Sequence, residues 1–148
     1  MNPPPPVFRD QRKIDDEHLK LLSLFHFIGA GLAVLGLLFL MVHFAVFHFV
    51  FQNPQMWEHS KQGPPPQFFF SILKFFYLLF GIWFATSGVL NLMSGLFLRA
   101  RKHRTFSMVV AIINCLHMPM GTVLGVFTMI VLMRDSVRDL YQNQPVTI

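Results

Sequence analysis

Three long apolar stretches, separated by short polar segments, make up most of this chain and limit how it can fold. They cover residues 19–51, 67–98 and 105–133. A helix needs about 20 consecutive apolar residues to cross the roughly 30 Å of hydrocarbon in a bilayer, and each stretch is longer than that. A helix also satisfies its own backbone hydrogen bonds, which lipid cannot do. The sequence therefore predicts an all-α integral membrane protein with three long transmembrane helices.

The composition agrees with a membrane protein and excludes several other classes. Hydrophobic residues are 53% of the chain and charged residues 13%, whereas a soluble domain has about a quarter of its residues charged. The net charge of +5 is compatible with nucleic-acid binding. However, Arg99, Arg101, Lys102 and Arg104 fill one short loop beside apolar stretches, where basic residues are explained by the positive-inside rule and anionic lipid. We expect a lipid bilayer and no nucleic acid as partner.

The pattern divides the chain into an arm, one transmembrane domain and a tail. Residues 1–18 open with a run of four prolines and are expected to form a disordered, Pro-rich cytoplasmic arm. Residues 19–141 form the domain, with helices at about 19–51, 67–98 and 105–134, and residues 142–148 form the tail. Asp15, Asp16 and Glu17 would cap the start of the first helix. This helix is too long for the apolar core of a cleaved signal peptide, so we expect it to remain as an anchor.

Orientation follows from the distribution of lysine and arginine. With three spans, the N-terminal arm and the second loop lie on one side of the membrane. That side holds eight basic residues: Arg9, Arg12, Lys13, Lys20, Arg99, Arg101, Lys102 and Arg104. The other side holds three, Lys61, Arg134 and Arg138, and Lys74 lies close to it. The sequence thus predicts a cytoplasmic N-terminus and an external C-terminus. The alternative is a re-entrant hairpin bent at Pro119 and Gly121, which puts the C-terminus in the cytoplasm. The length of the third stretch favours one kinked helix.

Each stretch carries a stripe of small and polar residues when it is drawn as a helix. Small residues let helix backbones approach in lipid. The glycines expected to mediate helix packing are Gly29, Gly36, Gly81, Gly88, Gly95, Gly121 and Gly125.

Three polar residues of these stripes fall at similar depths, about 10 to 15 Å from one end of the helices, and a fourth lies one turn deeper: His26, Asn91 and Asn114, with His117 beyond them. We interpret them as a polar packing layer that fixes helix register. Two alternatives stay open. The candidate ligands His26, His43 and His117 would hold haem or a metal, or His26 and His117 would handle protons. No cofactor is expected, and no catalytic residue or enzymatic motif is found.

Three segments of the chain carry a resemblance to a known group. They are HLKLLSLFH at residues 18–26, CLHMPMGTVLGVFT at residues 115–128 and VLMRDSV at residues 131–137. Together they resemble a family of small, uncharacterised bacterial integral membrane proteins. The resemblance implies a bacterial inner-membrane location and supplies no activity.

The leading prediction for function is a non-enzymatic structural or accessory subunit. We expect it to form a homo-oligomer or to join other membrane subunits, because phenylalanine-rich outer faces are candidate contacts. The alternatives are a small transport or channel unit whose polar stripes line a path, and a haem-binding redox subunit.

Overall fold

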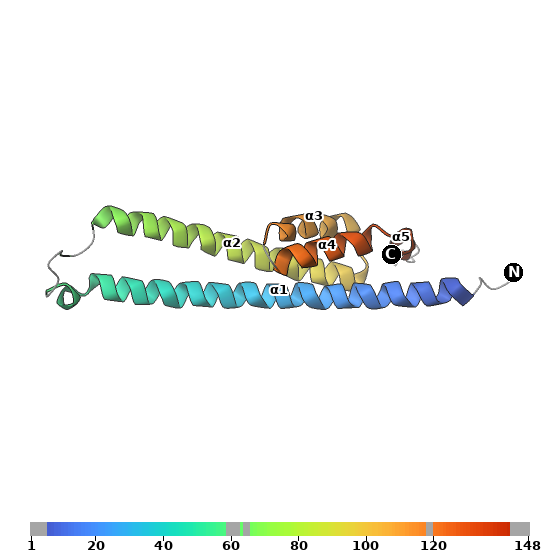
Figure 1. Cartoon of the computed structure of the whole chain (residues 1–148), viewed down its shortest axis with the longest axis horizontal. Helices are drawn as coiled ribbons and strands as arrows, with labels where there is room; N and C mark the ends of the chain where they lie inside the picture. Colours follow the sequence, from blue (N-terminus) through green and yellow to red (C-terminus); the bar gives the residue numbers. More distant parts are fainter. Residues whose placement is uncertain (1–5, 59–62, 64–65, 118–119, 143–148) are drawn as a thin grey trace, which may run out of the picture. The chain divides into compact units, whose positions relative to one another are not determined.

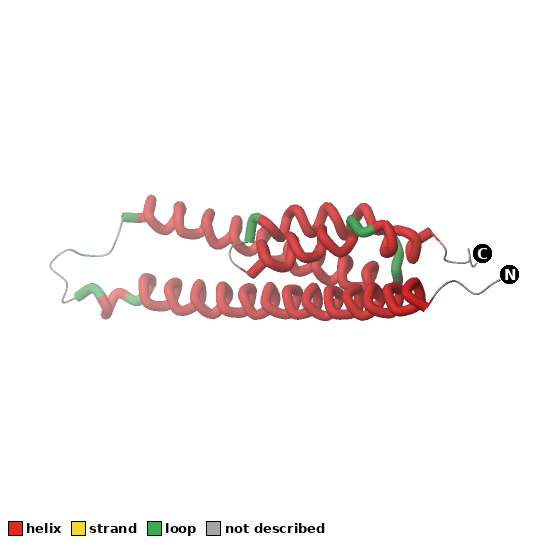
Figure 2. The backbone as a smooth tube through the Cα atoms, turned by 45° about the vertical axis from the view of Figure 1, so that its right-hand side comes forward, coloured by secondary structure: helices red, strands yellow, loops and turns green. Residues whose placement is uncertain are grey.

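The chain is almost entirely helical in the part that the structure describes. This computed structural model describes residues 6–58, 63, 66–117 and 120–142. Within these residues there is no strand (Figure 2). The helices are α1 (Pro6–Gln52), α2 (Gln67–Ala100), α3 (Arg104–Cys115), α4 (Met120–Leu132) and α5 (Asp135–Gln142), with a 3₁₀ turn at Pro54–Met56 (Figure 1). The predicted all-α class is confirmed.

The prediction of three membrane-spanning helices is wrong. Among the helices that the structure describes, only α1, with 47 residues, and α2, with 34 residues, are long and apolar enough to cross a membrane. The third apolar stretch forms two helices, α3 with 12 residues and α4 with 13. At 1.5 Å per residue these helices are about 18 to 20 Å long, shorter than the roughly 30 Å of a hydrocarbon core. The stretch folds back on itself, as in the alternative that the sequence left open.

The break between α3 and α4 has a local cause in the sequence. A proline at position 119 has no N–H to donate to the carbonyl of Cys115, the acceptor four residues earlier. In the structure this carbonyl accepts a hydrogen bond from the Thr122 hydroxyl at 2.9 Å. The Gly121 amide donates to the carbonyl of His117 at 2.8 Å. The backbone groups on both sides of the break therefore find partners close to it.

Two glycines of α4 allow it to lie directly against α3, beside which it runs in Figure 1. A Cβ on Gly125 would collide with the carbonyl oxygen of Ala111, and one on Gly121 would collide with the Cβ of His117. The open ends of the two helices are joined by Arg104, whose Nε donates to the carbonyl of Leu132 at 2.8 Å. The GxxxG pattern thus closes a helical hairpin within one chain.

Helix α1 begins at Pro6 and not at residue 19, so it includes much of the segment assigned to a disordered arm. Proline is tolerated in a first helical turn because its missing N–H has no partner there. The interpretation of Asp15, Asp16 and Glu17 as a helix cap is wrong, because all three lie inside α1. Asp15 is fully buried.

The residues fall into two compact units. The five-helix unit comprises residues 1–30 and 89–148, and therefore contains the hairpin and α5. Its apolar core draws on four helices and is formed by Leu19, Leu22, Leu98, Val131, Leu132 and Val137.

The two-helix unit comprises residues 31–88. Its two helical segments are antiparallel: a Cβ on Gly36 would lie 2.8 Å from a ring carbon of Phe84, and one on Gly81 would lie 3.8 Å from Leu40. Farther along, the rings of Phe51 and Phe70 meet edge to face with centroids 5.2 Å apart. Aromatic contacts of this kind add to the burial of the rings themselves.

Candidate functional site

A reciprocal pair of amides is the centre of the polar interior of the five-helix unit. The Asn91 amide nitrogen donates to Asn114 Oδ1 at 3.1 Å, and the Asn114 amide nitrogen donates to Asn91 Oδ1 at 2.8 Å. Both side chains are buried, with 4% and 3% of their surface exposed. On α1, Gly29 lies beside this pair, since a Cβ there would be in ordinary contact with Asn91 Oδ1 at 3.5 Å. The pair therefore joins α2 to α3 where α1 passes close.

His26 lies one helical turn before Gly29 on α1 and is fully buried. Its Nδ1 lies 2.9 Å from the carbonyl oxygen of Leu22. A carbonyl only accepts hydrogen bonds, so Nδ1 carries the proton and Nε2 of the neutral ring is an acceptor. Nε2 has no hydrogen-bond partner within the described ranges of the chain.

The other two candidate histidines have different surroundings. His117 is half-buried just after α3, with Nδ1 3.3 Å from the carbonyl oxygen of Ile113. His43 belongs to the two-helix unit, where it is exposed, hydrogen-bonded to the Tyr77 hydroxyl and stacked on Phe39. Across residues 6–58, 63, 66–117 and 120–142, no three His, Cys, Asp or Glu side chains are grouped so that they could hold a metal.

Small hydroxyl side chains complete the polar interior. The stripe predicted on the third stretch includes Thr128, whereas the three serines were not predicted. The Ser23 hydroxyl donates to the carbonyl of Gly95 at 2.8 Å, and the Thr128 hydroxyl donates to that of Leu124 at 2.7 Å. Ser94 and Ser107 are fully buried. A signal was present: Ser107 lies two helical turns before Asn114, and Ser23 lies one turn before His26, so each shares a face with a predicted polar residue.

The seven glycines expected to mediate packing have several kinds of neighbour. Gly95 faces Phe27, whose ring carbon would lie 2.9 Å from an added Cβ. Gly36 likewise faces an aromatic ring, Gly81 has looser contact, and Gly88 is half-buried. An added Cβ would collide with the carbonyl oxygen of Asn114 at Gly121, and with that of Ala111 at Gly125. The hairpin is therefore the place where glycine is least replaceable.

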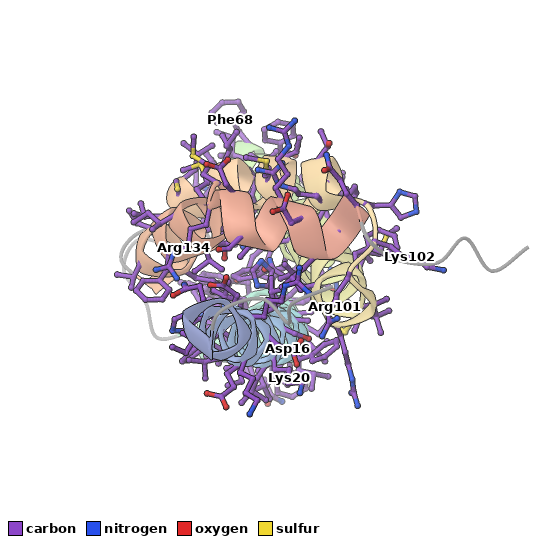
Figure 3. The ribbon with its side chains drawn as sticks, turned by 90° about the vertical axis from the view of Figure 1, so that its right-hand side faces the viewer. Asp16, Lys20, Phe68, Arg101, Lys102 and Arg134 are labelled. Carbon is purple, nitrogen blue, oxygen red and sulfur yellow. The ribbon has the colours of Figure 1, made fainter. Side chains whose placement is uncertain are left out.

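A cluster of charged side chains lies at the end of the five-helix unit where α1 starts and α2 ends. Asp16 forms ion pairs with Arg101 and with Lys20, the latter at 3.0 Å. Figure 3 shows Asp16 turned toward Arg101, whereas Lys102 points outward. The fully buried Asp15 lies 3.4 Å from Arg134, which follows α4. These ion pairs hold the start of α1 to the α2–α3 loop and to the α4–α5 turn.

Helix α5 covers this end of the unit through Val137, which is fully buried, and Tyr141. Burial raises the pKa of Tyr141 to about 12, an effect that Arg104 and Arg101 partly oppose. The phenol is therefore neutral at physiological pH, and it contributes to packing.

Comparison with family models, with curated proteins and with solved structures finds no match to this chain.

Proposed function

We propose that the protein is a membrane protein with two spans, α1 and α2, and a re-entrant α3–α4 hairpin. Support comes from the length of α1 and α2 and from the outward exposure of large apolar side chains, including Phe39, Phe68 and Phe75, which are 62–74% exposed. Non-helical backbone is tolerated at membrane depth where it is buried in protein or lines a cavity. At the α3–α4 break the Thr122 hydroxyl satisfies the carbonyl of Cys115, as Ser and Thr side chains do where helices break in membranes.

In this topology both termini lie in the cytoplasm. The ion pairs of Asp15 and Asp16 place the start of α1, the end of α2 and the start of α5 at one end of the unit. That side then holds ten basic residues and the other holds two: Arg9, Arg12, Lys13, Lys20, Arg99, Arg101, Lys102, Arg104, Arg134 and Arg138 against Lys61 and Lys74. This charge asymmetry is greater than with three spans, because the two-span topology puts the basic C-terminal segment on the cytoplasmic side.

The function that this interior supports best is a non-enzymatic structural or accessory subunit. The observation behind it is the Asn91–Asn114 pair, in which each amide both donates and accepts across helices. Such a pair specifies which faces of α2 and α3 meet. Hydrogen bonds between polar side chains of neighbouring helices also stabilise the association of those helices in lipid. The bacterial inner-membrane location implied by the resemblance, and assembly through the exposed phenylalanine faces, belong to the same proposal.

A transport unit is the second candidate, and one observation favours it. His26 Nε2, Ser94 Oγ and Ser107 Oγ are buried without hydrogen-bond partners among the residues described. Polar atoms of this kind inside a membrane domain are often part of an ion or proton path.

Proton flux into liposomes separates the two candidates. The full chain would be reconstituted with a pH-sensitive dye inside, as wild type, His26→Ala and His48→Ala, the last being exposed in the two-helix unit. If the protein is a structural subunit, the proton flux of all three proteins should equal that of protein-free liposomes. In that case His26→Ala only lowers stability, by about 2 kcal/mol for a large buried side chain. Flux that is lost in His26→Ala and retained in His48→Ala would establish transport instead.

A further inference from the structure

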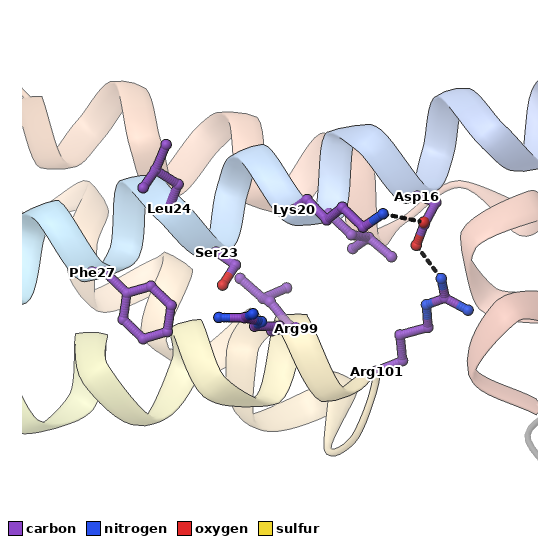
Figure 4. Close-up of a pocket in the computed structure, with 9 residues that line it drawn as sticks. Asp16, Lys20, Ser23, Leu24, Phe27, Arg99 and Arg101 are labelled. Atoms are coloured by element: carbon purple, nitrogen blue, oxygen red, sulfur yellow. Dashed lines mark hydrogen bonds and ion pairs between the residues drawn. The ribbon is translucent and has the colours of Figure 1, made fainter.

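A groove opens between α1 and α2 at the charged end of the five-helix unit. Its volume is about 460 Å³. Figure 4 shows Asp16, Lys20 and Arg101 at one end of it and Phe27 toward the other, with Arg99 on the α2 side. The groove is thus bounded by charged groups at one end and by apolar side chains along its length.

The charged end has an excess of positive charge. Three cations, Lys20, Arg99 and Arg101, line the groove with one carboxylate, Asp16. Asp16 is shared by Arg101 and Lys20, whereas Arg99 forms no ion pair in the described part of the chain. Arg99 is exposed, and Lys20 keeps 70% of its side-chain surface exposed. Both can therefore reach an anion without breaking the fold.

The apolar part of the groove continues in the direction of the hydrocarbon. Leu24 is 54% exposed beside it, and Phe27 is half-buried against Gly95. The Ser23 hydroxyl is already engaged by the carbonyl of Gly95. Between Lys20 and Phe27 the surface thus changes from cationic to apolar over two turns of α1. A ligand that fits both parts must have an anionic head and a hydrocarbon tail.

We propose that this groove binds an anionic phospholipid of the cytoplasmic leaflet. Lys20, Arg99 and Arg101 contact its phosphate, and one acyl chain lies along Leu24 and Phe27. Guanidinium groups match phosphate oxygens in geometry, and basic pockets between transmembrane helices on the cytoplasmic side are suited to anionic headgroups. This site rests on the topology of the proposed function, which puts the groove at the cytoplasmic interface.

Native mass spectrometry of the full chain, released from neutral detergent with added lipid, tests the site. Phosphatidylglycerol should bind, and phosphatidylcholine with the same acyl chains should bind much more weakly. The double variant Lys20→Gln/Arg99→Gln should lose roughly 20-fold in affinity for phosphatidylglycerol, because each basic residue near the headgroup contributes a several-fold effect. The single variant Arg99→Gln, which leaves the Asp16 pairs intact, should lose about 5-fold.

The matched control is Lys102→Gln, an exposed cation of the α2–α3 loop that does not line the groove. It should bind phosphatidylglycerol like the wild type. An equal loss in this variant would indicate only general attraction to the basic surface and would overturn the site. Glycerol 3-phosphate, which has the anionic head and no tail, should not displace the lipid at comparable concentration. Effective displacement would identify a site for soluble phosphate.

Failure of the site and failure of the topology give different results. Cysteine labelling that places residues 11 and 142 on opposite sides of the membrane refutes the proposed topology, whatever lipid binds. Labelling that places both in the cytoplasm, with no preference for phosphatidylglycerol, refutes the site alone.

Discussion

Replacing Gly125 with alanine is expected to separate α3 from α4 and to lower the free energy of unfolding by about 3 kcal/mol. An added Cβ collides with the carbonyl oxygen of Ala111 and lies 2.9 Å from the amide nitrogen of Cys115. Both are backbone atoms of α3, so no side-chain rotation can relieve the contact. The helix as a whole must move, which also strains the Arg104 bond to Leu132 at the other end of the hairpin.

Thermal unfolding in mild detergent measures this loss, and Gly31→Ala is the matched control. Gly31 lies on α1 with nothing within 4 Å of an added Cβ, so alanine there should raise stability by up to about 1 kcal/mol through helix propensity. The thiol of Cys115, the one cysteine of the sequence, gives a second readout. It lies against Gly125 and should react faster with a maleimide once the hairpin opens. A Gly125→Ala protein that melts and reacts like the wild type would refute the close packing of the hairpin.

Replacing Asn114 alone with leucine should cost about 2 kcal/mol, because it removes both hydrogen bonds between the two buried amides. The same is expected for Asn91→Leu. In the double variant two apolar side chains of similar volume meet, so much of the loss should be recovered, and the coupling between the sites should be about 1 to 2 kcal/mol.

A double-mutant cycle by thermal unfolding measures this coupling. Thr86→Val, a polar-to-apolar change at an exposed position of α2, should shift stability by less than about 0.5 kcal/mol. Additive losses from Asn91→Leu and Asn114→Leu would mean that the two amides do not interact, and the register interpretation would fail with them.

The two long helices could be predicted from the sequence because length and apolar composition suffice for them. The third stretch could not be assigned by length, which suits either one tilted span or two short helices. Local features decide between them. A proline at position 119 cannot donate to the Cys115 carbonyl, which accepts a hydrogen bond from Thr122 instead. Gly121 and Gly125 then allow α4 to contact the backbone of α3. The proline and the glycines are visible in the sequence, whereas the Thr122 bond requires coordinates.

The polar interior was predictable in part. Helical periodicity brought Asn91 and Asn114 onto facing stripes, and the structure pairs them. Helical periodicity could not predict the ion pair of Asp15 with Arg134. The two residues are distant in sequence, and they meet only because the hairpin returns the chain to the start of α1. Ser94 and Ser107 were overlooked because serine, being small, gives a weak signal in a helix that is apolar elsewhere.

The side of the membrane on which the C-terminus lies distinguishes a re-entrant hairpin from a third span. In a Cys115→Ala background, single cysteines would be placed at three exposed positions by Gln11→Cys, Gln55→Cys and Gln142→Cys. A maleimide that cannot cross membranes would be added to intact and to permeabilised cells. The re-entrant hairpin predicts that only the Gln55→Cys variant is labelled in intact cells and that the other two require permeabilisation. Labelling of the Gln142→Cys variant in intact cells, with the Gln11→Cys variant protected, would mean that the third stretch crosses the membrane and would refute the re-entrant hairpin.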